Sequence, residues 1–212
     1  MIKVEKFLVN PLQENSFVVY DETKECILID PGFHFKEERD EIRKFISDHH
    51  LKPVMIANTH AHFDHIMGVE FIRREYDIPF KIHPDDQFWV DRATEQGKMF
   101  GFEMEPVQPP DSFFTEKDTL NFGYASLSIL HIPGHSPGHI VFYSEPEKVL
   151  IAGDVLFYGS IGRTDLPGGD YYTLISGIKN KLFLLPEDTK VYCGHGPETS
   201  LGFEMSSNPF LT

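Results

Sequence analysis

The chain has 212 residues, of which 41% are hydrophobic, and a formal net charge of −14 from 33 acidic and 19 basic residues. This length suits one substantial domain, and no apolar stretch approaches the roughly 20 residues that span a bilayer. The acidic excess argues against a nucleic-acid substrate or partner, because basic groups that neutralise phosphates supply much of such affinity.

Residues 1–7 interleave acidic and basic side chains and lack the apolar core of a signal peptide, so we expect a cytoplasmic protein without membrane attachment. The first third of the chain is rich in apolar, β-branched runs, which predict strands, and one helix is expected between the third and fourth of them. The strands are expected at Ile2–Val9, Ser16–Asp21, Glu25–Asp30 and Val54–Ala57, and the helix at Glu37–His50.

The middle of the chain predicts a helix near Ile66–Glu75, a short strand at Phe80–His83, and a helix that begins at Pro84 and runs to about Gln96. Residues Gly97–Asp111 break this pattern with two glycines and three prolines. This segment is either a surface excursion packed by its own aromatic residues or a flap over a binding site.

The second half repeats the alternation of strands and helices. Strands are expected at Ala125–Ile132, Ile140–Ser144, Val149–Ala152 and Thr189–Cys193, and a helix at Tyr171–Leu185. This alternation suggests two β-sheets packed together with helices on both outer faces, which is an α/β or α+β fold. No linker or low-complexity tract divides the chain, so we expect residues 1–212 to form a single domain.

A cluster of candidate metal ligands follows the Val54–Ala57 strand directly. It consists of His60, His62, Asp64 and His65, and imidazole and carboxylate groups are ligands that zinc and iron accept. A single structural zinc ion needs only four ligands. More candidates follow downstream, so the sequence predicts either more than one metal or a catalytic ion with an open position.

The downstream candidates are His135, Asp154 and His195, and each follows an apolar run and a glycine. That pattern is typical of a side chain at the end of a strand, where the backbone bends tightly. We expect these loops to meet the first cluster at one edge of a sheet. His139 is interpreted as a supporting or structural residue, and Cys193 as a buried thiol.

Together these residues form the pattern HxHxDH…GH…GD…GH, which resembles the metallo-β-lactamase superfamily. Residues 133–139, 162–170 and 194–197, with the late Asn208-Pro209-Phe210, are similar to its glyoxalase II-like hydrolases. The resemblance implies a four-layer αββα sandwich and two divalent ions, with zinc as the first choice and iron or manganese as alternatives. It also implies that His60, His62 and His135 hold one ion, that Asp64, His65 and His195 hold the second, and that Asp154 bridges them.

Two divalent cations about 3.5–4 Å apart can lower the pKa of a shared water toward roughly 7 and polarise a carbonyl group. Asp154 suits the bridge because a carboxylate has two oxygens, one for each ion, and Asp64 could both ligate an ion and orient the hydroxide. This chemistry predicts hydrolysis of a small thioester, ester, lactone or amide. The resemblance narrows the substrate to a thioester of the hydroxyacylglutathione type.

The loop Gly159–Asp170 is the expected substrate element. The guanidinium of Arg163 either binds a substrate carboxylate or pairs with Asp165 to shape the loop. Phe157 and Tyr158 are expected to line the same pocket. Glyoxalase II proper carries a further helical region that helps to bind glutathione, whereas this chain ends 17 residues after His195. The resemblance is therefore to the short branch of the group, and the thiol stays open.

Two alternatives compete with the hydrolase. Persulfide dioxygenases share most of these motifs and, by resemblance, would hold a single iron on His60, His135 and Asp154, a ligand set that suits non-haem Fe(II). A metal-stabilised scaffold without activity is the second, and the complete ligand set argues against it. The acyl group, the physiological metal and the oligomeric state are left open by the sequence.

Overall fold

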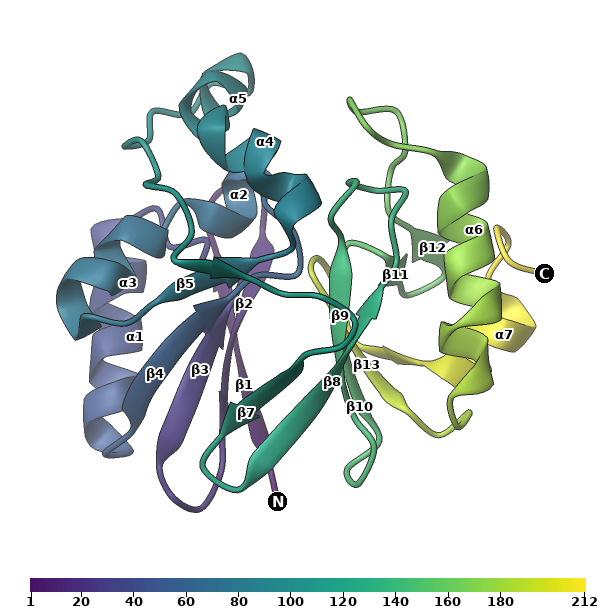
Figure 1. Ribbon diagram of the computed structural model, residues 1–212, viewed down its shortest axis with the longest axis horizontal. Coiled ribbons are helices and arrows are strands. Elements are labelled where there is room, and N and C mark those ends of the chain that lie inside the picture. Colours follow the sequence, from purple (N-terminus) through teal and green to yellow (C-terminus); the bar gives the residue numbers. More distant parts are fainter.

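Two six-stranded β-sheets lie face to face, with helices on the outer side of each (Figure 1). The structure is a computed structural model that describes residues Met1–Thr212. Four layers follow one another as helices, sheet, sheet and helices, which confirms the expected αββα sandwich. No helix in it has both the length and the apolar character that crossing a membrane requires.

The first sheet is built from the N-terminal half of the chain. Its first three strands pair antiparallel, and the later ones pair parallel. Helices α1 (Lys36–Asp48) and α3 (Val69–Tyr76) lie in the connections between parallel strands and cover the outer face (Figure 1). The strands, in their order across the sheet, are β1 (Lys3–Val9), β2 (Glu14–Tyr20), β3 (Glu25–Ile29), β4 (Lys52–Ala57), β5 (Phe80–Ile82) and β6 (Ser112–Phe113).

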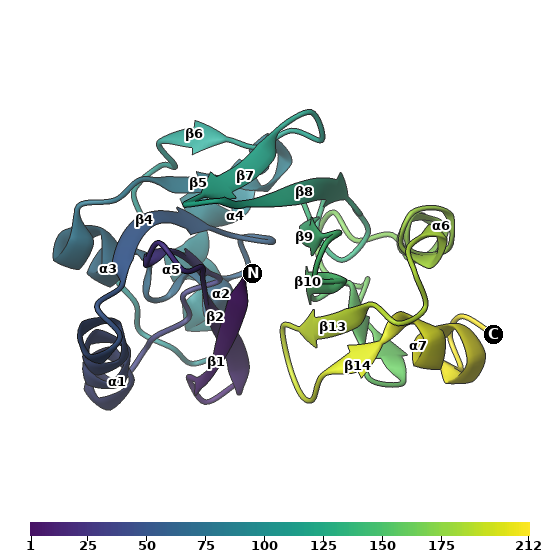
Figure 2. The same cartoon turned by 90° about the horizontal axis from the view of Figure 1, so that it is seen from below.

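The second sheet is built from the C-terminal half. Its outer face is covered by α6 (Tyr171–Asn180) and α7 (Leu201–Ser207), on the opposite side of the molecule from α1 and α3 (Figure 2). A 3₁₀ turn at Leu182–Leu184 follows α6, and a small hairpin of β11 (Leu156–Phe157) and β12 (Ser160–Ile161) lies outside the sheet. Across the sheet the strands are β14 (Thr199–Ser200), β13 (Lys190–Cys193), β10 (Val149–Gly153), β9 (Ile140–Ser144), β8 (Ala125–His131) and β7 (Thr119–Phe122).

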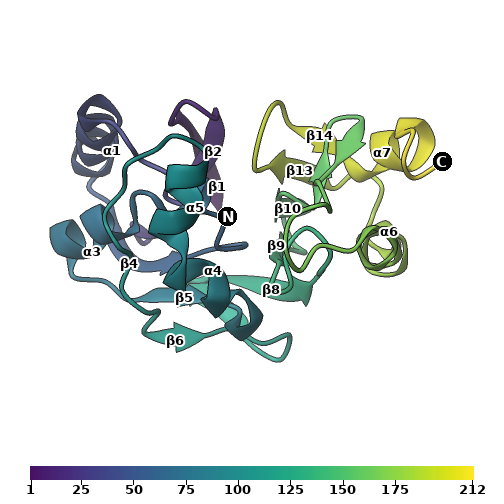
Figure 3. The same cartoon turned by 90° about the horizontal axis from the view of Figure 1, so that it is seen from above.

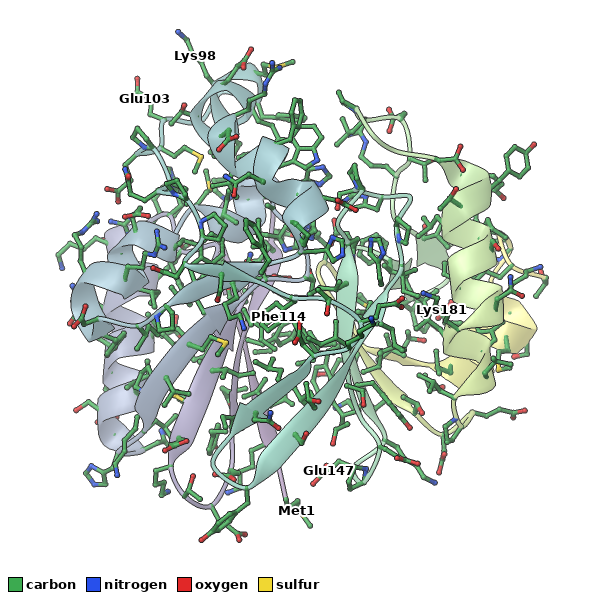
Figure 4. The ribbon with its side chains drawn as sticks, in the orientation of Figure 1. Met1, Lys98, Glu103, Phe114, Glu147 and Lys181 are labelled. Carbon is green, nitrogen blue, oxygen red and sulfur yellow. The ribbon has the colours of Figure 1, made fainter.

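Alternation of side chains along the strands divides the apolar residues among three cores. In β2, Phe17 and Val19 face the second sheet, whereas Val18 and Tyr20 pack with the residues under α1 and α3. Because successive side chains in a strand point to opposite faces, one strand can serve two cores. Phe114 lies between the two sheets (Figure 4), and a third core joins the second sheet to α6 and α7.

The loops at one edge of the sandwich carry the candidate ligands. Strands β3, β4 and β5 are parallel, as are β10 and β13, so each set has its carboxyl ends at a common edge. Figure 3 looks down on this edge and shows α4 (Gln87–Asp91) and α5 (Ala93–Met99) on one side. The chain before α6 lies across from them.

Several predicted elements differ in detail from the structure. The helix expected from Pro84 to Gln96 is a 3₁₀ turn at Pro84–Asp86 followed by α4 and α5, with the break at Arg92. The helix expected near Ile66–Glu75 is divided into α2 (Phe63–Ile66) and α3. The division falls at Gly68, whose N–H donates to the carbonyl of Pro31 at 2.7 Å.

Candidate metal centre

Three imidazoles converge at the edge of the sandwich that carries the candidate ligands, here called the ligand edge. They form the first set. His60 and His62 lie between β4 and α2, and His135 lies between β8 and β9. His62 Nδ1 is 2.9 Å from His135 Nε2, which is 3.3 Å from His60 Nε2. Three nitrogens about 2.0–2.1 Å from one tetrahedral ion lie about 3.3 Å apart, so this geometry fits one metal ion.

A second set lies beside the first. Asp64 and His65 belong to α2, and His195 follows β13. Asp64 Oδ2 is 3.3 Å from His195 Nε2 and 3.8 Å from His65 Nε2. His65 is fully buried, whereas the His195 side chain is 27% exposed. Two imidazoles and one carboxylate therefore face a common point that is reached from solvent on the His195 side.

Asp154 follows β10 and lies between the two sets. Its Oδ2 is 3.5 Å from His135 Nε2 of the first set and 3.7 Å from His195 Nε2 of the second. Its Oδ1 is 3.4 Å from His65 Nε2. Oδ2 thus faces both sets and Oδ1 faces the second, so the carboxylate lies between them.

Glycine is required beside this carboxylate. A Cβ atom on Gly194 would lie 2.1 Å from Asp154 Oδ1, and Gly153 has a φ of +49°, in the left-handed region. Asp154 Oδ1 and His65 Nε2 are buried and have no hydrogen-bond partner. Because unpaired buried polar atoms are costly, these two atoms fit a bound cation.

Four of the five ring nitrogens that face away from the two sets contact polar atoms of the protein, whereas His62 Nε2 is buried without a hydrogen-bond partner. Hydrogen bonds of this kind fix the tautomer of a ligand imidazole and direct its other nitrogen inward. The partners are Thr59 Oγ1 for His60 Nδ1 at 3.1 Å, Asp30 Oδ2 for His65 Nδ1 at 3.2 Å, the carbonyl of Arg163 for His135 Nδ1 at 2.8 Å, and the carbonyl of Leu12 for His195 Nδ1 at 3.1 Å.

The electrostatics of the two sets differ. Burial lowers the pKa of His60, His62 and His135 below the ordinary value, and neighbouring imidazoles lower the first two further. Burial also opposes a charge on His65, but the carboxylates of Asp154 and Asp64 outweigh it and raise its pKa well above the ordinary value. The lowered pKa values favour neutral imidazoles, the form that ligates a cation, in the first set, whereas the raised pKa of His65 favours its protonated form in the second.

Two buried carboxylates support the ligand loops, and neither stood out in the sequence. Asp30 accepts from the N–H of Thr59 at 2.7 Å, from Thr59 Oγ1 at 2.6 Å and from His65 Nδ1. Asp86 accepts from the N–H of Ala61 at 2.9 Å, from Ser136 Oγ at 2.8 Å and from the N–H of Gly138 at 2.6 Å. Asp86 therefore ties the loop of His60 and His62 to the loop of His135.

His139 and Cys193, which the sequence did not assign as ligands, lie next to the candidate ligands. His139 is buried, accepts from the N–H of Asp154 at 3.0 Å, and stacks on His60 with ring centroids 4.7 Å apart. This is the supporting position that was expected. Cys193 is a buried free thiol, and burial raises its pKa to about 12, so a thiolate ligand is disfavoured.

A cavity of about 440 Å³, here called the main pocket, opens above the two sets. Phe157 and Arg163 line it, whereas Tyr158 does not, because its ring stacks on Phe203 of α7 at 4.7 Å. Arg163 makes two 2.7 Å hydrogen bonds to Asp165, through Nε and Nη2. The candidate ligands at its floor are His62, Asp64, His135, Asp154 and His195, and its walls also include Leu12, Phe63, Gln96, Phe100, Ser160, Ile161 and Leu166.

The segment Gly97–Asp111 was expected to be either a surface excursion packed by its own aromatic residues or a flap over a binding site, and it has features of both. Phe100 lines the main pocket and stacks on Phe63 with ring centroids 5.2 Å apart. Phe102 packs against the same ring at 5.5 Å, and Val107 is buried in the core beneath. The segment is thus packed by its own aromatic residues and also supplies one wall of the pocket.

Residues 9–195 match the sequence pattern of the family described as the metallo-beta-lactamase superfamily. The chain belongs to this superfamily. It is 39% identical to the probable metallo-hydrolase YqgX of Bacillus subtilis and 36% identical to the hydroxyacylglutathione hydrolase GloC of Haemophilus influenzae. Each comparison covers 99% of this chain and 98% of the relative. A metal-dependent hydrolase is the activity class that these similarities support.

Two solved structures are similar to the whole chain. The B3 metallo-beta-lactamase BLEG-1 has a TM-score of 0.90 and 40% identity, with 100% of both chains covered. TTHA1623, in a di-iron-bound form, has a TM-score of 0.89 and 37% identity, with 98% of this chain and 100% of that one covered. The ligand edge therefore belongs to a fold in which metal binding is the common feature.

The position of Asp86 leads to a first prediction. Asp86→Asn should weaken metal binding by about 10- to 100-fold, because its amide NH₂ would face a backbone N–H where the carboxylate accepts. The dissociation constant can be measured by competition with a chromophoric chelator. The visible spectrum of the cobalt-loaded protein should change as well, since the two ligand loops lose their common brace.

Asp48→Asn is the matched control. Its side chain is 54% exposed on α1, pairs with Lys44 and belongs to neither ligand set, so metal affinity should stay at the wild-type value. Ser136→Ala removes one of the three hydrogen bonds and should act in the same direction with a smaller effect. Unchanged metal affinity in Asp86→Asn, or equal losses in the two Asp→Asn variants, would show that Asp86 does not support metal binding by joining the two ligand loops.

Proposed function

We propose that this protein is a dinuclear metal-dependent hydrolase of a thioester, with a hydroxyacylglutathione as the first substrate to test. The observation that carries the proposal is the place of Asp154, whose Oδ2 faces both ligand sets at the floor of the main pocket. The similarity to GloC supports the thioester, and the similarity to a di-iron structure supports two ions. Zinc is our first choice of metal, with iron or manganese next.

When bound, two divalent ions would supply an activated water and polarise the carbonyl group of the substrate. The ligand assignment follows the two sets, with Asp154 as the bridge. Asp64 Oδ2 lies on the pocket floor, where it would accept a hydrogen bond from the attacking water and orient it. Phe100, Phe157 and Ile161 form apolar walls that exclude bulk water from the reacting atoms.

The metal content and the substrate class can be tested together. Protein loaded with excess zinc or iron should contain close to two equivalents by elemental analysis, since two sets share one bridge. The loaded protein should hydrolyse thioesters faster than lactones or β-lactams in a side-by-side screen. A stoichiometry of one, with oxygen consumption on a persulfide and no loss on replacing Asp64 or His195, would instead favour the mononuclear dioxygenase.

Asp154→Asn should lower turnover by about 10²-fold or more while the fold stays intact, which circular dichroism and thermal unfolding can verify. The amide cannot offer the same negative charge to two cations, and losses of this size follow removal of a main electrostatic element. Asp188→Asn is the control, because its 67% exposed side chain pairs only with Lys148. Hydrolysis by Asp154→Asn near the wild-type rate would eliminate the mechanism.

Arg163 provides a test of substrate charge. Its Nε and Nη2 donate to Asp165, so the edge of the guanidinium that contains Nη1 would be the one to contact a substrate carboxylate. Arg163→Ala should raise KM mainly for thioesters that bear a carboxylate, and Arg163→Lys should rescue only part of this loss, because an ammonium cannot make two parallel hydrogen bonds. Steady-state kinetics with a charged and an uncharged thioester measure the effect.

A different result is expected if the Arg163–Asp165 pair only stabilises the loop. The carbonyl of Arg163 accepts from the ligand His135, so a disordered loop would affect every substrate alike. In that case Asp165→Ala should reproduce Arg163→Ala on both thioesters. Equal losses on charged and uncharged substrates would reject the carboxylate anchor.

A further inference from the structure

A second, smaller cavity adjoins the main pocket and is not used by the proposed chemistry. This side hollow has a volume of about 120 Å³ and shares Gln96, Phe100 and Leu166 with the main pocket. The shared residues place the two cavities side by side. A substrate group that reaches from above Asp154 past Phe100 would therefore meet the side hollow next.

The walls of the side hollow are mainly apolar and come from two separate parts of the chain. One wall is formed by α4 and α5, which rise above the ligand edge where Lys98 marks the end of α5 (Figure 4). The other is formed by Leu166 and Pro167, in the loop that also carries Arg163. Each wall is joined to a ligand loop by a hydrogen bond, since Gln96 Oε1 accepts from the N–H of Phe63 and the carbonyl of Arg163 accepts from His135.

Several apolar side chains of the first wall are unusually exposed. Phe88 is 46% exposed, Met99 79% and Phe100 45%, and these residues lie around one hollow. Proteins seldom leave neighbouring apolar groups in water unless they contact a ligand or partner. The lining that the hollow shares with the main pocket favours part of the substrate, rather than a separate molecule, as its occupant.

The charges around the side hollow are already compensated. The guanidinium of Arg92 lies over the Phe88 ring, 4.6 Å from its centroid, and 4.0 Å from a carboxylate oxygen of Glu95. Gln96 Oε1 accepts from the N–H of Phe63 at 2.9 Å. The two charged residues of the lining, Arg92 and Glu95, are of opposite sign, so the hollow has no net charge and its apolar walls favour an uncharged group.

We propose that the side hollow binds an apolar arm of the substrate, a phenyl ring or an alkyl group of about four to six carbons. The size follows from the volume, since an apolar cavity of about 150 Å³ holds benzene. This inference rests on the proposed thioester hydrolase and makes it selective for thioesters with an apolar group. The arm belongs either to the acyl part or to the thiol, and the chemistry of recognition is the same.

Two substrate series test the proposal in the metal-loaded enzyme. One lengthens the acyl group from acetyl to hexanoyl and phenylacetyl on a constant thiol, and the other lengthens the thiol on a constant acetyl group. In one series kcat/KM should rise by up to about fourfold for each methylene, equivalent to about 0.8 kcal/mol, and level off when the hollow is full. The responsive series shows which part carries the arm.

Phe88→Ala and Met99→Ala should each reduce the preference for the long over the short substrate by about five- to tenfold. Phe113→Ala is the matched control, because this aromatic side chain is 42% exposed on β6, outside both cavities. It should leave the preference unchanged. A flat response in both series, or a preference that survives Phe88→Ala, overturns the proposal.

Trp89 gives a readout that does not depend on turnover. It is the single tryptophan of the chain, is 5% exposed and lines the side hollow. Titration with non-hydrolysable alkyl thioethers should change its fluorescence saturably, with affinity that grows from methyl to butyl and falls in Phe88→Ala. No hydrolysis of any thioester would reject the proposed function, whereas no length-dependent binding would reject the side hollow itself.

Discussion

The donor atoms of five imidazoles and two carboxylates are crowded at one buried edge of the sandwich, and most of the surrounding structure serves to hold them there. Nitrogen lone pairs 2.9–3.3 Å apart repel unless a cation or a proton lies between them. The carboxylates of Asp64 and Asp154 instead favour a proton on His65, and four of the five outward ring nitrogens contact fixed polar atoms of the protein. Such an arrangement is stable only as a whole, because each ligand depends on partners from distant parts of the chain.

This dependence explains which parts of the site were visible in the sequence. The candidate ligands could be proposed from the sequence because they follow strands and tight turns, and the structure brings them together at one edge. The strands were visible because alternating apolar residues serve two cores at once. Asp86 was not visible, since its partners are 25 to 52 residues away in the chain and a lone aspartate in a loop is usually solvated.

The elements that the sequence missed share a different cause. Strand β7 and helix α7 are short, and α7 contains Gly202 and two serines, which favour a helix weakly. Their conformation is decided by packing on the second sheet. Tyr158 was expected in the pocket from its place next to Phe157, but it lies in the turn between β11 and β12, where the chain reverses. Its ring therefore contacts α7 rather than the main pocket.

The ligands are divided between the two sheets, which gives the centre a mechanical role. His60, His62, Asp64 and His65 follow β4 of the first sheet, while His135, Asp154 and His195 follow strands of the second. Ions held by both groups would act as cross-links between the halves of the sandwich, much as a disulfide joins distant segments. Loss of the ions would then allow the two sheets to separate at this edge, while Phe114 and its neighbours in the core between them would keep the rest of the sandwich packed.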